Sequence, residues 1–179
     1  GVKSYTLPLK KIVISNRINN ELKNNLGIGP FPVIFNGIDT NIFKKEQKKY
    51  EKKDMVFLML NHTLEKKGVK QGLKVFEKVR KSFPDVKLVM FGMCSSSNLP
   101  NYVEYVQNPT VNQLVDLYNM ADIFIFPSLE EGWGLTPLEA MACGCAVVAT
   151  KTGFVIDLGE NGKNMMISEP GDIQGMVDN

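Results

Sequence analysis

The feature that most constrains the fold is the regular alternation of two kinds of segment from Met55 onward. Short, continuous apolar runs alternate there with segments whose apolar residues recur every three or four positions. Continuous apolar runs are typical of strands buried on both faces of a parallel sheet. The runs cover residues 55–60, 86–91, 103–106, 123–126 and 146–149. The sequence therefore predicts an α/β fold, a Rossmann-like doubly wound parallel sheet with helices on both faces.

Two amphipathic helical patterns separate these runs. Their apolar residues, spaced to face a sheet, are Val69, Leu73, Phe76 and Val79 in the first pattern and Leu114, Leu117, Tyr118 and Ala121 in the second. The segment 171–179 also begins like a helix but stops within about two turns, so the chain looks cut short there. Ligands of such sheets bind beyond the carboxyl ends of the strands, which directs attention to 61–68, 92–98, 127–134 and 150–154.

The first part of the chain predicts a single strand-helix-strand unit. Ile12 to Ile14 is a candidate strand, and the helix that follows runs from Asn16 to Leu26 and ends at Gly27. Val33 to Phe35 is the second strand, closed by a turn at Asn36-Gly37. This unit is too small to be a domain of its own.

A lysine-rich stretch separates this unit from the regular part of the chain. Its lysines are Lys44, Lys45, Lys48, Lys49, Lys52 and Lys53. The intervening residues 46–47 and 50–51 are polar or mixed and supply no apolar face, so a solvated linker is favoured over a membrane-docking helix. We divide the chain at this linker, residues 44–54, which leaves 1–43 before it and one main domain over 55–179.

Composition removes several classes of function. With 21 basic and 19 acidic residues among 179, the net charge of +2 gives no indication of nucleic-acid binding. The three cysteines, Cys94, Cys143 and Cys145, have no paired spacing, and the single histidine, His62, leaves little to complete a metal site. No run approaches the roughly 18 apolar residues of a membrane span. A cytoplasmic setting is predicted, with peripheral membrane contact left open.

The segment from Glu130 to Gly144 is the densest in chemical information. It follows an apolar run and opens a helix, for which Thr136 is a suitable N-cap and Pro137 a suitable first residue. Glu139 stands three positions after Thr136, which completes a capping-box pattern, and Gly144 ends the helix after about two turns.

An anion site is predicted at the start of this helix. The free N–H groups of a helix amino end attract a diphosphate, and Gly132 and Gly134 let a ligand approach the backbone. A well-capped short helix without a ligand is an equally good interpretation of the helix-end chemistry alone. Glu131 and Glu139 favour a sugar nucleotide, because carboxylates accept hydrogen bonds from hydroxyls. Trp133 is either a wall or lid of this pocket or, more commonly, a core residue.

The run E-G-W-G-L-T-P-L-E-A-M-A, with seven residues between Glu131 and Glu139 and A-D-I-F-I-F-P-S before it, resembles the carboxyl-terminal domain of family 4 retaining glycosyltransferases, which have the GT-B fold. The N-G-I-D of residues 36–39, followed by Phe43, is similar to the family's hinge. The resemblance covers most of the chain. It implies that residues 1–43 are a remnant of an acceptor domain with the hinge, and that 55–179 bind a nucleotide-diphospho-sugar.

The resemblance also implies residue roles. Glu131 would contact the donor sugar and stabilise the transition state, and Lys67 would neutralise the leaving diphosphate without proton transfer. Glu139 would bind the ribose, and the backbone N–H groups of Leu135 and Thr136, beside Gly134, would bind the diphosphate. Gly92 would stand where the backbone passes near the nucleotide. The family's pocket uses cationic residues and a helix dipole, so no metal and no further cofactor are expected.

The sequence departs from the family at two places. His62 replaces an arginine, and a neutral histidine supplies no guaranteed charge, so a ligand role and a structural role for His62 are equally good interpretations. Gly153 to Asp157 replaces the family's paired glycines and downstream glutamate.

Several functions remain open at this stage. The favoured one is a hexosyltransferase donor domain of the UDP or GDP type for polysaccharide biosynthesis, which lacks its amino-terminal acceptor domain and has little activity alone. The alternatives are a non-catalytic nucleotide-sugar binding module and a nucleotide-sugar epimerase. A dehydrogenase is strongly disfavoured because no G-x-G-x-x-G follows a strand. A phosphorylase with a pyridoxal cofactor has no distinctive signature here.

Overall fold

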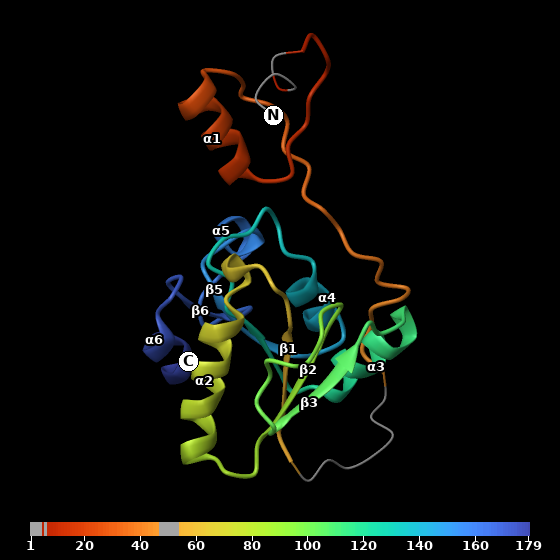
Figure 1. Ribbon diagram of the computed structural model, residues 1–179. Coiled ribbons are helices and arrows are strands. Elements are labelled where there is room, and N and C mark those ends of the chain that lie inside the picture. The colour runs from red at the N-terminus through yellow and green to blue at the C-terminus, as the bar shows by residue number, and fades with distance from the viewer. Residues whose placement is uncertain (1–4, 6, 47–53) are drawn as a thin grey trace.

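A six-stranded parallel sheet forms the centre of the molecule (Figure 1). The computed structural model describes residues 5, 7–46 and 54–179. The strand order is β3-β2-β1-β4-β5-β6. The strands are β1 (Val56–Leu60), β2 (Lys87–Gly92), β3 (Val103–Gln107), β4 (Ile123–Phe126), β5 (Ala146–Thr150) and β6 (Met166–Ser168). The predicted Rossmann-like α/β fold is confirmed, and β6 is an additional strand that the sequence did not indicate.

Six α-helices connect or flank these strands in the described part of the chain. They are α1 (Asn16–Leu26), α2 (Val69–Ser82), α3 (Val111–Met120), α4 (Thr136–Ala142), α5 (Phe154–Leu158) and α6 (Ile173–Asp178). A short 3-10 helix, η2 (Glu65–Lys67), precedes α2. As predicted, α1 ends at Gly27, which has a left-handed φ of 65°.

Two hydrophobic layers enclose the sheet, because alternate residues of each strand point to opposite faces. Leu58 and Phe124 face the layer that α3 and α4 cover, where Tyr118 is fully buried. Met59 and Ile125 face the opposite layer, which receives Phe76 and Met176 from α2 and α6. The continuous apolar runs of the sequence are therefore explained by burial on both faces.

The amino-terminal segment contains less sheet structure than its sequence predicts. The predicted strands 12–14 and 33–35 are reduced to one parallel bridge between Val13 and Val33. The amide of Val13 donates to Pro32 O at 3.0 Å, and the amide of Ile34 donates to Val13 O at 2.9 Å. Neither segment pairs with a strand of the main sheet among the described residues, so the ladder does not extend.

The turn predicted at Asn36-Gly37 is wrong, because the chain has no turn there and turns at residues 40–42 instead. The side chain of Asp39 produces this turn: its Oδ1 accepts from the amide of Asn41 at 2.9 Å, while its carbonyl accepts from the amide of Phe43 at 2.9 Å. Asp is well suited to this arrangement, since its carboxylate can bond to the backbone two residues ahead.

The predicted linker begins on the surface of α3. The Asn119 Oδ1 atom accepts a hydrogen bond from the amide of Glu46 at 2.8 Å, and its Nδ2 donates to the carbonyl of Lys44 at 3.1 Å. The rest of the linker prediction, including Lys48, Lys49, Lys52 and Lys53, falls within 47–53, outside the described residues. Over the described ranges, every helix is too short or too polar to cross a bilayer.

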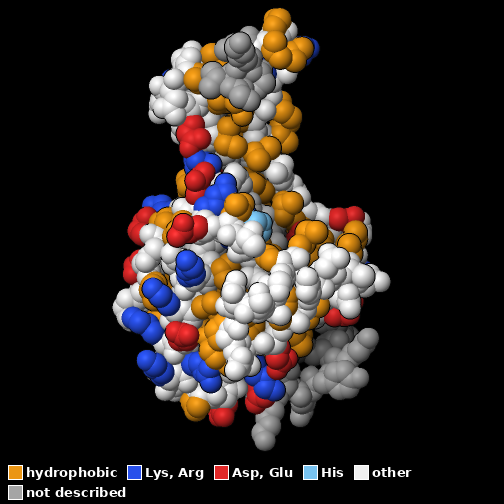
Figure 2. Space-filling view, in the orientation of Figure 1, with side chains coloured by type: hydrophobic (Ala, Val, Ile, Leu, Met, Phe, Trp, Pro, Cys, Tyr) orange, Lys and Arg blue, Asp and Glu red, His pale blue; other side chains and the backbone are white. Residues whose placement is uncertain are grey.

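The amino-terminal segment projects from the α/β body beyond α5 (Figure 1). At its base, the amide of Asn16 donates to Asp157 Oδ2 at 3.2 Å. The segment exposes many apolar side chains, which form a nearly continuous patch in the space-filling view (Figure 2). The exposed residues include Leu7, Leu9, Ile12, Ile34 and Phe35. Clustered exposed apolar residues of this kind are typical of surfaces that contact another protein, a membrane or a ligand.

Candidate functional site

The direction of the chain reverses across the sheet between β1 and β4. From β1 the chain passes through α2 to β2 and β3 on one side, and then returns to place β4 on the other side of β1. The loops that leave β1 and β4 therefore run in opposite directions from adjacent strand ends. In open α/β sheets, ligands bind at such a switch point.

The two loops are packed against each other through their backbones. The carbonyl of Lys66 accepts the amide of Leu129 at 2.7 Å. Gly68 has a φ of 67°, and a Cβ at this position would lie 1.9 Å from the carbonyl oxygen of Pro127. Only glycine fits both this conformation and this approach. The loop after β1 is thereby held against the loop after β4.

This packing brings together the two residues predicted to be catalytic. Lys67 Nζ lies 2.7 Å from Glu131 Oε1, although the residues are 64 positions apart in the sequence. Ser128 Oγ donates to the same oxygen at 2.9 Å. The Glu131 side chain is only 7% exposed and that of Lys67 is 22% exposed. Glu131 Oε2 accepts no hydrogen bond from the described residues, so this oxygen is available to a ligand.

The backbone around Glu131 is fixed from two further directions. Arg17 of α1 donates from Nη2 to the carbonyl of Glu131 at 2.9 Å. Gly153 lies on the other side, where a Cβ would come within 2.8 Å of Glu131 Cβ and 2.2 Å of Trp133 O. The position of the carboxylate is therefore set by segments from the beginning, middle and end of the chain.

The capping box predicted at α4 is wrong. The N-cap is Leu135, which makes no side-chain cap, and Pro137 is buried in the first turn. Glu139 turns to the neighbouring helix instead, where its Oε2 accepts from Tyr118 Oη at 2.8 Å. Burial raises the pKa of Glu139, and the hydrogen bond from Tyr118 opposes that rise. A capping box does occur at α3, between Thr110 and Gln113.

Backbone N–H groups at the start of α4 lie outside the helical hydrogen-bond ladder. The amide of Glu139 makes the first helical bond, to Leu135 O at 3.0 Å, so the N–H groups of Leu135 and Thr136 precede the hydrogen-bond ladder. Gly134 just before them has a φ of 91°. A Cβ there would meet the Phe126 ring at 2.8 Å, so close packing as well as conformation requires glycine. As predicted, α4 ends near Gly144, whose φ is 95°.

His62 and Gly92 line a separate pocket of about 560 Å³ between the ends of β1 and β2. A Cβ at Gly92 would lie 2.2 Å from Asn61 O. His62 Nδ1 accepts the amide of Leu64 at 3.0 Å, so the neutral ring carries its proton on Nε2. Nε2 makes no hydrogen bond with the described residues and can donate to a ligand. This pocket and the Lys67–Glu131 pair occupy the same edge of the sheet.

Trp133 is a buried contact of the amino-terminal segment. Its ring is 4% exposed and stacks on Phe35 at 5.0 Å between centroids. Its Nε1 donates to Asn36 O at 3.1 Å. The interpretation as a core residue is therefore confirmed, and its packing connects residues 35–36 to the loop that carries Glu131.

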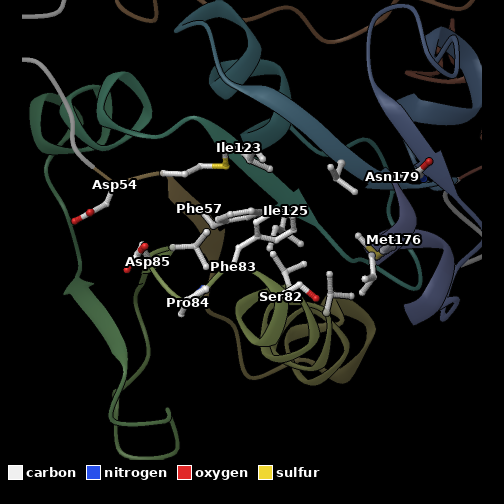
Figure 3. Close-up of a pocket in the computed structure, with 16 residues that line it drawn as sticks. Asp54, Phe57, Ser82, Phe83, Pro84, Asp85, Ile123, Ile125, Met176 and Asn179 are labelled. Atoms are coloured by element: carbon white, nitrogen blue, oxygen red, sulfur yellow. The ribbon is translucent and has the colours of Figure 1, made fainter.

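A deep apolar pocket of about 470 Å³ lies at the opposite edge of the sheet (Figure 3). Phe57, Ile123, Ile125 and Met176 surround it, and Asp54 and Asp85 stand at its rim. Among the described residues, its walls offer few polar groups and no lysine or arginine to a diphosphate, so they do not favour a sugar nucleotide. In the described ranges, no group of three His, Cys, Asp or Glu side chains could hold a metal ion.

Three residues of the site were missed from the sequence. Ser128 was noted only as part of a motif, and Tyr118 only as a core position of a helix. Arg17 lies on the polar side of α1, and nothing in its surroundings indicates a contact 114 residues away. The strand end before Ser128 was the one usable signal, because residues at such ends face the ligand edge.

The chain is an α/β domain with a Rossmann-like parallel sheet, and the paired Lys67 and Glu131 lie at its switch point. The family described as "Glycosyl transferases group 1" matches residues 40–179, and the chain belongs to this family. It is 27% identical over 94% of its length to the capsular polysaccharide biosynthesis glycosyltransferase CapM of Staphylococcus aureus. The chain spans about half of CapM, 47% of its length.

Solved structures share the fold. HepE of Anabaena, in complex with UDP-glucose, superimposes with a TM-score of 0.80 at 20% identity, over 98% of this chain and 54% of HepE. The carboxyl-terminal domain of the group 1 glycosyl transferase LpcC from Francisella tularensis gives a TM-score of 0.67 at 24% identity, over 79% of this chain and 85% of that domain. CapM and LpcC are transferases by name, which does not favour the binding-module or epimerase alternatives.

Proposed function

We propose that this chain is the donor-binding half of a GT-B glycosyltransferase of the retaining family 4, a hexosyltransferase that uses a UDP or GDP sugar. The observation that carries the proposal is the ion pair between Lys67 and Glu131, built where the loops after β1 and β4 meet. A partly buried cation and carboxylate at the switch point provide the two charges that transfer of a sugar from a diphosphate requires.

Lys67 acts on the leaving group in this mechanism. Negative charge accumulates on the nucleoside diphosphate as its bond to the sugar breaks, and a fixed ammonium stabilises that charge without transferring a proton. Lys67 is held by Glu131 before the donor arrives. The diphosphate therefore shares or takes over this ammonium on binding, and the backbone N–H groups of Leu135 and Thr136 supply further donors.

Glu131 acts on the sugar. Its Oε1 is occupied by Lys67 and Ser128, which leaves Oε2 to accept a sugar hydroxyl or to stabilise positive charge on the ring. Glu139 binds the ribose hydroxyls, and His62 and Gly92 lie along the nucleotide side of the pocket. We propose that the reaction needs no metal, since Lys67 and backbone donors supply the positive charge.

The acceptor side belongs to a second domain in this proposal, of which residues 1–43 are a part. The exposed apolar residues of the projecting segment support this, because Leu9 and Ile12 are 66% and 61% exposed. Glycan and lipid-linked saccharides are the proposed acceptors, in line with polysaccharide biosynthesis. Without a second domain to hold the acceptor hydroxyl against the sugar, the chain alone binds the donor but transfers little.

Thermal unfolding with a panel of UDP, GDP, ADP and their sugars, in the presence of EDTA, tests the proposal. A ligand at a hundred times its dissociation constant adds about 2.7 kcal/mol of stability. We expect a UDP or GDP compound to raise the Tm, and Lys67→Ala to abolish the shift. Lys163→Ala is the matched control, since Lys163 forms an exposed ion pair with Glu160. Absence of a shift with every compound would contradict donor binding.

A further inference from the structure

The carboxylate of Glu139 is bound on one side by a tyrosine that the proposed chemistry does not use. Tyr118 Oη donates to Oε2 at 2.8 Å, while Oε1 accepts no hydrogen bond from the described residues. We propose that Tyr118 is the positioning residue for Glu139, and that it directs Oε1 to the ribose of the bound nucleotide. This inference rests on the proposed function and extends it to a residue that does not touch the ligand.

The hydroxyl of Tyr118 is a fixed point in the fold. The side chain is fully buried, and its ring lies between the rings of Phe43, Phe91 and Phe124 at centroid distances of 6.0, 5.8 and 5.9 Å. Cys145 Sγ donates to the backbone carbonyl of Tyr118 at 3.0 Å, which holds the end of α3 as well. A group packed on all sides can determine where a partly exposed carboxylate points.

Tyr118 is also a permanent donor. Burial and the neighbouring Glu139 carboxylate raise the pKa of Tyr118 above its ordinary value of 10.0, so the hydroxyl keeps its proton throughout the working range of pH. Its hydrogen bond lowers the pKa of Glu139 against the effect of burial. Tyr118 thus favours the ionised form, the form in which both carboxylate oxygens accept hydrogen bonds.

The local sequence also allows the Glu139 side chain an alternative conformation. It stands three residues after Thr136 at the start of α4, where a glutamate typically folds back onto its own helix end. Here the hydrogen bond with Tyr118 holds the side chain against α3 instead. Loss of the hydroxyl therefore frees Glu139 to adopt conformations directed away from the ligand, and a lower affinity follows.

Calorimetric titration of the 179-residue chain with UDP and with GDP, from pH 5 to 8, tests the role of Tyr118. Tyr118→Phe keeps the ring and removes the hydroxyl. We expect the affinity to fall about tenfold to a hundredfold at pH 7.5, the effect of one lost hydrogen bond to a charged group. The loss of binding on the acid side should also begin at a higher pH, because the pKa of Glu139 rises. Far-UV circular dichroism and thermal unfolding verify that the variant is folded.

Tyr102→Phe is the matched control, because Tyr102 Oη bonds to Glu77 Oε1 at 3.2 Å in another part of the fold. It should leave both affinity and pH profile unchanged. In a Glu139→Gln background, Tyr118→Phe should cause no further change in the pH profile. If Tyr118→Phe binds like the wild type at every pH, the positioning role is wrong and donor binding stands. If the wild type binds neither nucleotide, the proposed function fails together with this inference.

Discussion

The carboxylate of Glu131 is buried and accepts hydrogen bonds from two donors, Lys67 and Ser128. Its ion pair with Lys67 is more exposed on the lysine side, at 22%, than on the glutamate side, at 7%. The free-energy cost of desolvation is therefore larger for the carboxylate than for the lysine. Such a group is costly to leave without its cation, whereas removing both charges together leaves no unpaired ion.

Lys67→Met should reduce the free energy of unfolding by about 1–3 kcal/mol, because it keeps much of the side-chain volume but leaves Glu131 without a cation. The double variant Lys67→Met/Glu131→Gln should recover most of this loss. Urea denaturation of both proteins measures the difference. A double variant no more stable than the single one would show that the pair is not a determinant of stability. Neither variant should bind a nucleotide diphosphate.

The raised pKa of Glu139 predicts that the free energy of unfolding depends on pH. Because burial raises its pKa above the ordinary value of 4.5, the ionised carboxylate is less stable in the folded chain than in the unfolded one. This penalty is absent below pH 4.5, where the group is protonated in both states, and it develops as the pH rises through the raised pKa.

Glu139→Gln should therefore stabilise the folded chain at pH 8 and have little effect at pH 4, while it weakens nucleotide binding. Chemical denaturation at the two pH values provides the measurement. Glu104→Gln, on β3, serves as a control for removal of one negative charge. Equal effects of Glu139→Gln at both pH values would contradict the assignment of the penalty to ionisation.

At the scale of elements, the short helix η2 and Gly68 determine where Lys67 lies. Gly68 and Gly27 have almost the same backbone conformation, with φ values of 67° and 65°. A Cβ at Gly68 would lie 1.9 Å from Pro127 O, whereas a Cβ at Gly27 would meet nothing within 4 Å. The two positions therefore separate the cost of conformation from the cost of a steric clash.

Gly27→Ala should cost about 1 kcal/mol, the usual penalty for a left-handed alanine. Gly68→Ala should cost at least about 2 kcal/mol more, because the backbone of the loop after β4 must move. It should also lower nucleotide affinity, since Lys67 and Glu131 separate. Thermal unfolding and titration of the two variants give the comparison. Similar losses of stability in both would mean that the close approach to Pro127 is unimportant.

The main elements were predictable because their signal is local. The strands β1, β2, β4 and β5 are apolar runs buried on both faces, β3 is a partly exposed edge strand, and helices α1, α2 and α3 carry apolar residues at helical spacing. The strand β6 was missed because Met166–Ser168 has only three residues. The paired strands at 12–14 and 33–35 were overestimated, because an apolar run forms a ladder only where a neighbouring strand is present.

The site was predictable in its residues but not in its contacts. The motif indicated Lys67 and Glu131, yet their ion pair depends on two loops that only the sheet order brings together. The pattern at Thr136 and Glu139 fits a capping box, and the contact with Tyr118 from another helix overrides it. Local patterns cannot reveal such competition, because the competing donor is 21 residues away.

At the scale of the whole molecule, the chain combines a six-stranded parallel sheet with a small projecting segment. The segment contacts the body through Arg17 with the Glu131 carbonyl, through Asn16 with Asp157, and through Phe35 and Asn36 with Trp133. Its exposed apolar patch has no cover in the described part of the chain. The chain spans 47% of CapM and 54% of HepE, so further protein accompanies the corresponding region in these relatives.

The purified 179-residue chain should therefore bind donor but transfer sugar to a saccharide acceptor at no more than a trace rate. Transfer should appear when the chain is fused to a separate domain that binds the acceptor but not the donor, such as that of a CapM-like enzyme. Release of UDP or GDP in the presence of acceptor is the measurement, and the Lys67→Ala fusion is the control. Robust turnover by the isolated chain would contradict the assignment of the acceptor site to a second domain.

Trp133 gives this molecule a built-in optical reporter. It is the only tryptophan in the sequence, and its indole is stacked on Phe35 of the amino-terminal segment, two residues from Glu131. Any movement of that segment relative to the α/β body changes the surroundings of the indole and hence its emission. The tryptophan fluorescence of the unmodified chain can thus follow such movement in real time, with no dye attached.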